Sequence, residues 1–283
     1  MDAQPRPAYS GIVPGMIPRL PLALLVTLAI VPFSTAQNFS GSDTFDGTVI
    51  NPSNWGTELS QNGGAFTANY GSLNFTDSGA TWSTHSSAMR SWILNVGSYT
   101  ADWQVQIDFT LNTTLIAGQS VDWTMVLANS DSVDDYIAVT LSKFGDMAGN
   151  PSAKAAVKSN GSDGPFAVQV TTNPTTATMY VGYIASSETL IAAYDSGSGL
   201  TNLLSVSVGS SGQAWNMTSG STFQLSIKAT NAPNAGPTSA LVEGVFTADN
   251  FLASATTPVP EPSTYALLAG LAALGVVAWR RRS

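Results

Sequence analysis

Trp103-Gln104-Val105-Gln106-Ile107-Asp108-Phe109-Thr110 is the stretch of sequence that decides the fold class. Its apolar residues stand at every second position, and polar residues stand between them. Successive side chains of a β-strand point to opposite faces of the sheet. The stretch therefore predicts an antiparallel strand with one buried face and one face toward solvent.

The same alternation returns farther along the chain, between clusters of turn-forming residues. Its apolar positions are Phe166, Val168 and Val170, then Leu204, Val206 and Val208, then Phe223, Leu225 and Ile227. The turn clusters lie at Asn62 to Gly64, Ser159 to Gly164 and Asp195 to Gly199. No helical period and no fixed-period repeat appears between these stretches. We therefore predict an all-β fold, an antiparallel two-sheet sandwich whose inner faces bury the alternating residues.

The composition of the segment from Gln37 to Pro258 limits what it can bind and what can stabilise it. This segment has five Lys/Arg against sixteen Asp/Glu, a formal charge of −11, and the chain has no cysteine. Disulfides therefore cannot stabilise it. So acidic a segment repels nucleic acid and suits divalent cations or neutral glycans, and no nucleic-acid partner is predicted.

The N-terminal region has the order of features found in a secretory signal peptide. Arg19 precedes an apolar run from Leu20 to Val31, and Ser34-Thr35-Ala36 supplies small residues at a cleavage site. We predict a signal peptide over residues 1–36, with Met16 as the true start and cleavage after Ala36. The Sec translocon and signal peptidase are its predicted partners.

The C-terminal region combines a proline-rich segment, an apolar helix and a cluster of arginines. The closely spaced prolines of residues 255–262 hold the backbone extended, so this segment is predicted as a linker. Residues 263–283 are predicted as a transmembrane helix followed by Arg280, Arg281 and Arg282. Arginines after the apolar stretch stay in the cytoplasm, which places the rest of the chain outside the inner membrane.

This C-terminal order resembles the PEP-CTERM sorting signal. The matching residues are Val259, Pro260, Glu261 and Pro262, the helix that follows, and the three arginines. The resemblance implies a Gram-negative host that makes exopolysaccharide and processing by an exosortase, a membrane transpeptidase. The inner membrane would then hold the protein only transiently, before its release to the outer surface or extracellular matrix. An ordinary anchor that is never cut is the alternative.

The segment 37–254 is predicted as the β-sandwich domain, and its two ends resemble a known family. Asp43-Thr44-Phe45-Asp46-Gly47, with Asn54-Trp55 after it, is similar to the opening of a concanavalin A-like or laminin G-like jelly roll. Asp249-Asn250-Phe251 is similar to the closing strand of such domains. The resemblance implies that the first and last strands pair. An immunoglobulin-like or other sandwich is the alternative.

The sequence offers no catalytic residue. Laminarinase-type hydrolases on this jelly roll use a Glu-x-Asp-x-(x)-Glu strand, and Glu58, Glu188 and Glu243 have no Asp or Glu two residues away. His85 is the only histidine, so a zinc site built on several His or Cys is excluded, and it lacks a nucleophile-elbow motif around it. We therefore predict that the protein is not an enzyme.

Calcium is the candidate ion for this acidic segment, because hard cations prefer carboxylate and carbonyl oxygens. Asp43, Asp46 and Asp249 would approach one another if the first and last strands adjoin, so they are the candidate ligands. No EF-hand or nonapeptide spacing is present, and ordinary solvated turns are the alternative. No other cofactor is predicted.

Glycan binding would use exposed aromatic faces, which complement the C–H side of a sugar ring. Trp103 and Trp123 lie on alternating strands and are predicted to be core. Trp82, Trp92 and Trp215 lie near Ser/Gly-rich segments and are the candidate glycan-binding residues.

We expect an exported, non-enzymatic cell-surface or extracellular-matrix protein with a structural or adhesive role linked to exopolysaccharide or biofilm. A glycan-binding module that acts on exopolysaccharide is the first alternative. A glycoside hydrolase of the jelly-roll type is the second.

Overall fold

The computed structural model describes residues 38–77, 85–145, 152–170, 175–209, 212–213, 215–233 and 240–255. The predicted signal peptide, linker, C-terminal helix and the candidate Trp82 lie outside these ranges. The chain divides into two compact units, Met1–Ser34 and Thr35–Ser283, and every described residue belongs to the second. None of the helical structure in the described ranges is long and apolar enough to cross a membrane.

Within these ranges the chain folds into strands and one short 3-10 helix. The strands are β1 (Gly41–Asp43), β2 (Leu59–Gln61), β3 (Ala65–Asn69), β4 (Ser72–Thr76), β5 (Ser86–Ser91), β6 (Gly97–Ser98), β7 (Trp103–Leu111), β8 (Gln119–Asn129), β9 (Ser132–Phe144), β10 (Ser152–Ser159), β11 (Ser162–Val170), β12 (Thr176–Ile184), β13 (Thr189–Asp195), β14 (Thr201–Ser207), β15 (Thr222–Pro233) and β16 (Phe246–Ala255). The helix η1 (Ala185–Ser187) connects β12 to β13.

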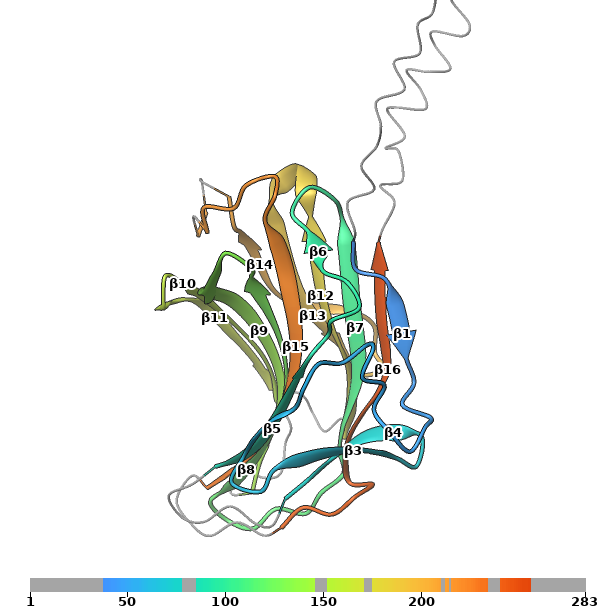
Figure 1. The fold of residues 1–283 in the computed structure, drawn as a ribbon. Helices are drawn as coiled ribbons and strands as arrows, with labels where there is room; N and C mark the ends of the chain where they lie inside the picture. The colour runs from blue at the N-terminus through green and yellow to red at the C-terminus, as the bar shows by residue number, and fades with distance from the viewer. Residues whose placement is uncertain are drawn as a thin grey trace, which may run out of the picture. The chain divides into compact units, whose positions relative to one another are not determined.

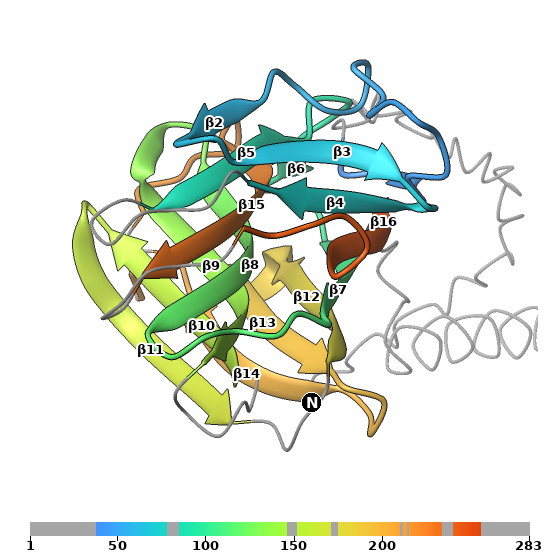
Figure 2. The ribbon, with the colours of Figure 1, turned by 90° about the horizontal axis from the view of Figure 1, so that it is seen from below.

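The strands form two antiparallel sheets that face each other (Figure 1). Sheet I has the order β14-β13-β12-β7-β16-β4-β3, with β1 added beside β16. Sheet II has the order β11-β10-β9-β8-β15-β5-β2, with β6 added beside β15. Figure 2 shows the strands of both sheets from below. The predicted all-β fold, an antiparallel two-sheet sandwich, is confirmed.

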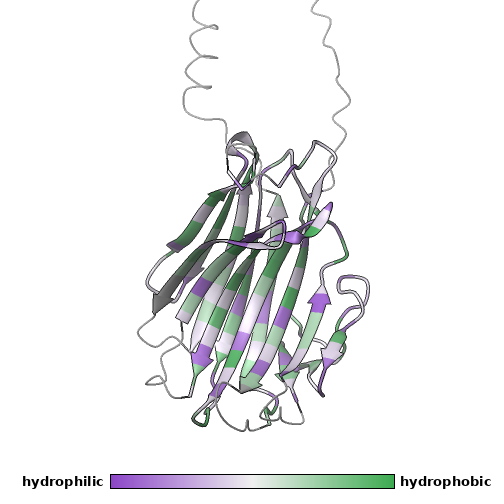
Figure 3. Cartoon of the chain, turned by 90° about the vertical axis from the view of Figure 1, so that its left-hand side faces the viewer, coloured by the Kyte–Doolittle hydropathy of each residue, from purple (hydrophilic) through white to green (hydrophobic). Residues whose placement is uncertain are grey.

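The alternation in the sequence becomes alternation between the core and the outer faces. Along β7, every residue from Trp103 in steps of two is buried, and those between are partly exposed. β8 and β12 follow the same pattern through most of their length. Figure 3 shows hydrophobic and hydrophilic residues alternating along the strands. The period of two in the sequence therefore predicted both the strands and their buried sides.

Stacked and edge-on aromatic rings fill the space between the sheets. Trp123 of β8 is fully buried and lies between Phe66, at 5.5 Å between ring centroids, and Phe109, at 5.2 Å, with nearly parallel rings. Phe66 and Phe109 belong to sheet I, so this stack joins the two layers. Trp103 likewise contacts Phe223 across the layers at 5.2 Å. The prediction that Trp103 and Trp123 are core residues is confirmed.

The first and last strands of the domain are neighbours. β1 pairs antiparallel with β16, with Gly41 opposite Ala253 and Asp43 opposite Phe251. This confirms the pairing that the jelly-roll resemblance implied. It also places the described ends of the domain on the same sheet.

One predicted core position is wrong. Phe166 of β11 is 63% exposed, although its alternating pattern predicted burial. β11 is the edge strand of sheet II, and Phe166 lies opposite Ala156, a position on the outer side of β10. The turn predicted from Ser159 to Gly164 is also shorter than expected. Within it, only Asn160 and Gly161 have positive φ, and β11 already begins at Ser162.

Asp122 of β8 provides a test of how the outer face of sheet II affects stability. Burial raises the pKa of Asp122 above its ordinary value, although the Ser142 hydroxyl donates to its carboxylate and Lys154 and Lys228 oppose the shift. The folded protein therefore binds this proton more tightly than the unfolded chain does. Stability should fall as the pH rises from the ordinary pKa through the raised one.

We expect Asp122→Asn to raise the thermal unfolding midpoint at pH 7, because asparagine removes the desolvated charge and keeps an oxygen that accepts from Ser142. The difference from wild type should disappear near about pH 3, below both pKa values. Asp163→Asn is the control, since the side chain of Asp163 is 88% exposed. A lower midpoint for Asp122→Asn at pH 7 would show that the lysines outweigh burial.

Candidate functional site

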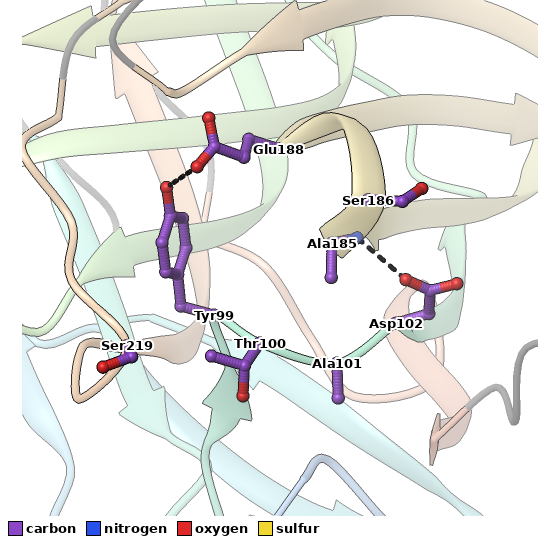
Figure 4. Close-up of a pocket in the computed structure, with 8 residues that line it drawn as sticks. All are labelled: Tyr99, Thr100, Ala101, Asp102, Ala185, Ser186, Glu188 and Ser219. Carbon is purple, nitrogen blue, oxygen red and sulfur yellow. Dashed lines mark hydrogen bonds between the residues drawn. The ribbon is translucent and has the colours of Figure 1, made fainter.

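The candidate site is an open cavity of about 590 Å³ at one end of the sandwich (Figure 4). Three segments form it: the connection from β6 to β7, the η1 turn between β12 and β13, and the loop that precedes β15. It is lined by Tyr99, Thr100, Ala101, Asp102, Ala185, Ser186, Glu188 and Ser219. Its volume lies within the range of about 300–1,000 Å³ that is usual for small-molecule sites.

Tyr99 and Glu188 form one wall of the cavity. The Tyr99 hydroxyl donates to Oε1 of Glu188 at 2.5 Å, and the two residues are 89 positions apart in the sequence. Burial, followed by the hydrogen bond to Glu188 and its charge, raises the pKa of Tyr99 to about 12. Tyr99 therefore remains a protonated donor at neutral pH, and one carboxylate oxygen of Glu188 is held in place.

The backbone around Glu188 explains why its carboxylate stays at the cavity. Glu188 follows η1 with φ 49° and ψ 41°, the left-handed region, and its amide donates to the Ala185 carbonyl at 3.2 Å. Its own carbonyl accepts from the Val208 amide at 2.8 Å. Gly209 lies against the carboxylate so closely that a Cβ atom there would collide with it. The turn and the glycine thus hold the side chain from both sides.

Asp102 lies on the opposite wall and connects the cavity to the ends of the domain. Its Oδ1 accepts from the Ala185 amide at 2.8 Å, which fixes η1 against the start of β7 (Figure 4). The Asn38 side chain donates to the Asp102 carbonyl at 2.9 Å, and Ala255 pairs with Trp103. Both ends of the described domain therefore lie beside this cavity.

A stack of buried rings supports Tyr99 from behind. Tyr183 stacks on Tyr99 at 5.8 Å between ring centroids and on Trp103 at 5.7 Å, and it is 2% exposed. Burial, together with the nearby Tyr99 and Glu188, raises the pKa of Tyr183 above its ordinary value. Its buried hydroxyl makes no hydrogen bond of ordinary geometry with a described residue, although the Tyr99 hydroxyl is near enough to affect its pKa. The cavity thus has a rigid aromatic base.

A second cavity of about 370 Å³ shares Asp102 with the first. It lies where β7, β12 and β13 are adjacent in sheet I, and its lining includes Tyr180, Ile184 and Leu200. Ile184 is 38% exposed and Leu200 is 66% exposed. Its lining has one carboxylate and several large aliphatic side chains, whereas the first has two carboxylates and no aliphatic side chain larger than alanine among the described residues.

Two of the three tryptophans predicted to bind glycans are buried. Trp92 is 3% exposed and packs on Phe251 at 4.5 Å and on Trp55 at 5.0 Å. Trp215 is 2% exposed, and its Nε1 donates to the Ser159 hydroxyl at 2.9 Å. The expectation that these two rings are exposed is therefore wrong, because residues distant in sequence pack over them. Trp82 lies outside the described residues.

The predicted calcium ligands approach one another but do not form a coordination group. Asp249 of β16 lies opposite Asp108 of β7, and Asp43 of β1 lies opposite Phe251, two residues from Asp249. After burial, the charges of Asp108, Asp46 and Asp43 raise the pKa of Asp249. Each accepts a hydrogen bond near its own position: Asp43 from the Phe45 amide, Asp46 from the Thr44 hydroxyl and Asp249 from the Asn250 amide. Among the described residues, no three His, Cys, Asp or Glu side chains are arranged to hold a metal ion.

The sequence alone did not single out Tyr99, Asp102 or Glu188 as site residues. Glu188 was considered only as part of a hydrolase strand motif, which the sequence lacks. The available signals were weak: Asp102 directly precedes the deciding strand, and Glu188 follows two serines between two strands. Neither signal indicates which distant residue the side chain contacts in the folded protein.

Residues 258–282 match the family model of the PEP-CTERM protein-sorting motif. The chain carries a PEP-CTERM sorting motif. The match spans Val259, Pro260, Glu261, Pro262 and all three arginines, so the resemblance noted in the sequence is confirmed. The motif marks an exported protein that passes through the membrane and is sorted by an exosortase. A search of curated proteins gave no match.

The domain is similar in fold to solved structures of low sequence identity. An endo-1,3-beta-glucanase from Streptomyces sioyaensis has a TM-score of 0.54 at 11% identity, over 79% of this chain and 98% of that one. A pseudo beta-1,3-glucanase and immunostimulatory antigen of Mycobacterium tuberculosis has 0.50 at 13%, over 78% and 100%. A legume lectin-like domain from Entamoeba histolytica has 0.46 at 12%, over 72% and 91%. At such identities, the likeness to the two structures with TM-scores of 0.54 and 0.50 shows the jelly-roll fold alone.

Proposed function

We propose that this exported protein is a non-enzymatic component of the cell surface or extracellular matrix, with an adhesive or structural role. The observation that carries the proposal is that each of the three glutamates of the sandwich already accepts a bond from another side chain through at least one oxygen. Glu58 pairs with Arg90 at 3.2 Å, Glu243 accepts from Thr67 at 2.7 Å, and Glu188 accepts from Tyr99. Glycoside hydrolysis needs two carboxyl groups that are free to act on the substrate, one as general acid and one as nucleophile or general base.

The sorting motif supports a final position outside the inner membrane. A transpeptidase that removes the tail would release the domain from its helix, and the acidic segment would not adhere to anionic lipid. The matrix polysaccharide is then the partner that fits best. We expect the protein to remain with the matrix of its native host and to enter the soluble fraction when the polysaccharide is digested.

The test of the non-enzymatic proposal is the release of reducing ends. We expect no release from β-1,3-glucan or from matrix polysaccharide when the purified protein is incubated with either. An active endo-1,3-beta-glucanase, the activity named for the similar Streptomyces sioyaensis structure, is the positive control. Release that a single Asp or Glu substitution abolishes would replace this proposal with a glycoside hydrolase.

A glycan-binding module is the second candidate, and the cavity at the end of the sandwich favours it. This cavity offers an aromatic wall together with fixed carboxylate acceptors, the two kinds of groups that sugars contact through C–H faces and hydroxyls. The two candidates are compatible, since binding without cleavage would itself be adhesive.

A further inference from the structure

We propose that the end cavity binds a glycan through a sugar unit that carries a free amine, with Asp102 placed between two sugar subsites. The inference rests on the proposed non-catalytic function and specifies its ligand. Three features carry it: the two carboxylates of the cavity, its fixed aromatic wall and the aliphatic side chains of the cavity beside it.

The charge of the lining selects against anionic ligands. Asp102 and Glu188 line the cavity, and no Lys, Arg or His is among the described residues that line it. The ion pairs of the described residues, Arg90 with Glu58 and Lys158 with Asp163, involve none of the lining residues. A hydroxyl-rich ligand with an ammonium group supplies both the donors and the positive charge that two carboxylates attract.

The carboxylates are already positioned for a ligand. One oxygen of Glu188 is held by Tyr99 and one oxygen of Asp102 by the Ala185 amide, so neither side chain must be ordered when a ligand binds. Pre-organised acceptors reduce the entropic cost of association. A metal ion is a poorer fit, because Ca²⁺ takes six to eight oxygens and the cavity offers two partly engaged carboxylates.

Tyr99 adds an aromatic wall to the cavity. Tyr99 is half-buried and locked by its hydrogen bond to Glu188 and by its stack on Tyr183, so its remaining surface can face the C–H side of a sugar ring. Tyr183 lies behind this wall and lines the adjoining cavity.

The adjoining cavity indicates which kind of sugar would lie next to the amine-bearing one. It shares Asp102 with the first cavity and presents Ile184, Leu200 and the ring of Tyr180. Apolar side chains suit an uncharged sugar unit or its acetyl group better than a second ammonium. The two cavities together therefore fit a polymer in which free-amine and acetylated sugars are neighbours, a partly deacetylated amino-sugar glycan.

The experiment measures binding of the full chain in detergent to partly deacetylated and to fully N-acetylated glucosamine oligosaccharides at pH 6. We expect saturable binding of the deacetylated probe and at least tenfold weaker binding of the acetylated one. Asp102→Asn and Glu188→Gln should each weaken the binding of the deacetylated probe by about tenfold to a hundredfold, the usual effect of a hydrogen bond to a charged group.

Two further variants keep the test independent of folding. Ser219→Lys places a cation at the exposed rim and removes no bond of the turn, so it should also abolish binding. Glu243→Gln is the matched control, a carboxylate with its own side-chain partners outside the cavity lining, and it should bind as wild type does. Thermal unfolding of each variant reports whether the fold is intact.

Equal affinity for both probes would overturn the role of the amine. The absence of binding to either probe, or unchanged binding by folded Asp102→Asn and Ser219→Lys, would overturn the site. None of these results would affect the proposed function, which instead fails if reducing ends accumulate from the probe during the measurement.

Discussion

Replacing Pro260, Glu261 and Pro262 together with alanine is expected to leave the protein full-length and in the inner membrane. These residues lie within the matched sorting motif. Proline disfavours helix, and we expect this to keep the motif accessible to the processing enzyme. Alanine removes that restriction, because it is the strongest helix former. The measurement is intact mass and membrane fractionation in the native host.

The wild-type protein should be recovered beyond the inner membrane without Trp279 and the arginines, with its mature chain beginning at Gln37. Glu243→Gln serves here as well as a control, because it changes a carboxylate of the sandwich and leaves the motif intact. If the triple alanine variant were trimmed and released at the wild-type level, the motif would not govern processing. The helix would then be an ordinary anchor or the target of another protease.

Trp123→Ala is expected to destabilise the sandwich by about 3–5 kcal/mol, the range for large aromatic truncations in a core. The ring is fully buried and stacks between Phe66 and Phe109, and it also contacts Phe246 at 5.0 Å. Its partners belong to sheet I and it belongs to sheet II, so truncation opens a cavity where the layers meet. Because a typical domain has only about 5–15 kcal/mol of stability, this loss is a large share of it.

Denaturant unfolding of Trp123→Ala and Phe166→Ala side by side checks this expectation. Phe166 is an aromatic residue of the same sheet, but it is 63% exposed, so its loss should change stability by no more than about 0.5 kcal/mol. Equal effects of the two substitutions would mean that the contacts of Trp123 between the layers do not determine stability. A disulfide cannot compensate for either loss, since the chain has no cysteine.

Local patterns predicted the fold well where a strand has neighbours on both sides. β7 lies between β12 and β16, and its alternating residues are buried as predicted. Phe166 carries the same pattern on the edge strand β11 and faces outward instead. Alternation predicts which residues share a face of a strand. Whether that face is buried depends on whether the other sheet covers it.

The candidate site was not predictable in the same way. Trp92 and Trp215 were predicted to be exposed from the Ser/Gly-rich sequence near them, yet Phe251 covers the first and Phe223 lies near the second, at 6.4 Å. Conversely, Glu188 and Tyr99 meet only because η1 turns back toward the start of β7. Local composition describes only the residues nearby in the sequence. The burial and contacts of these side chains depend on residues that pack against them from elsewhere in the chain.

By itself, the sequence determined the strand character of the domain and the sorting motif at the C-terminus. Both are local properties: a period of two sets the sides of a strand, and the motif is a run of neighbouring residues. The tertiary structure alone decided which polar residues form a cavity and that Trp92 and Trp215 are core. The cavity depends on contacts between residues more than 80 positions apart, Tyr99 with Glu188 and Asp102 with Ala185. The two tryptophans are buried by partners elsewhere in the chain, Phe251 for Trp92 and Ser159 for Trp215.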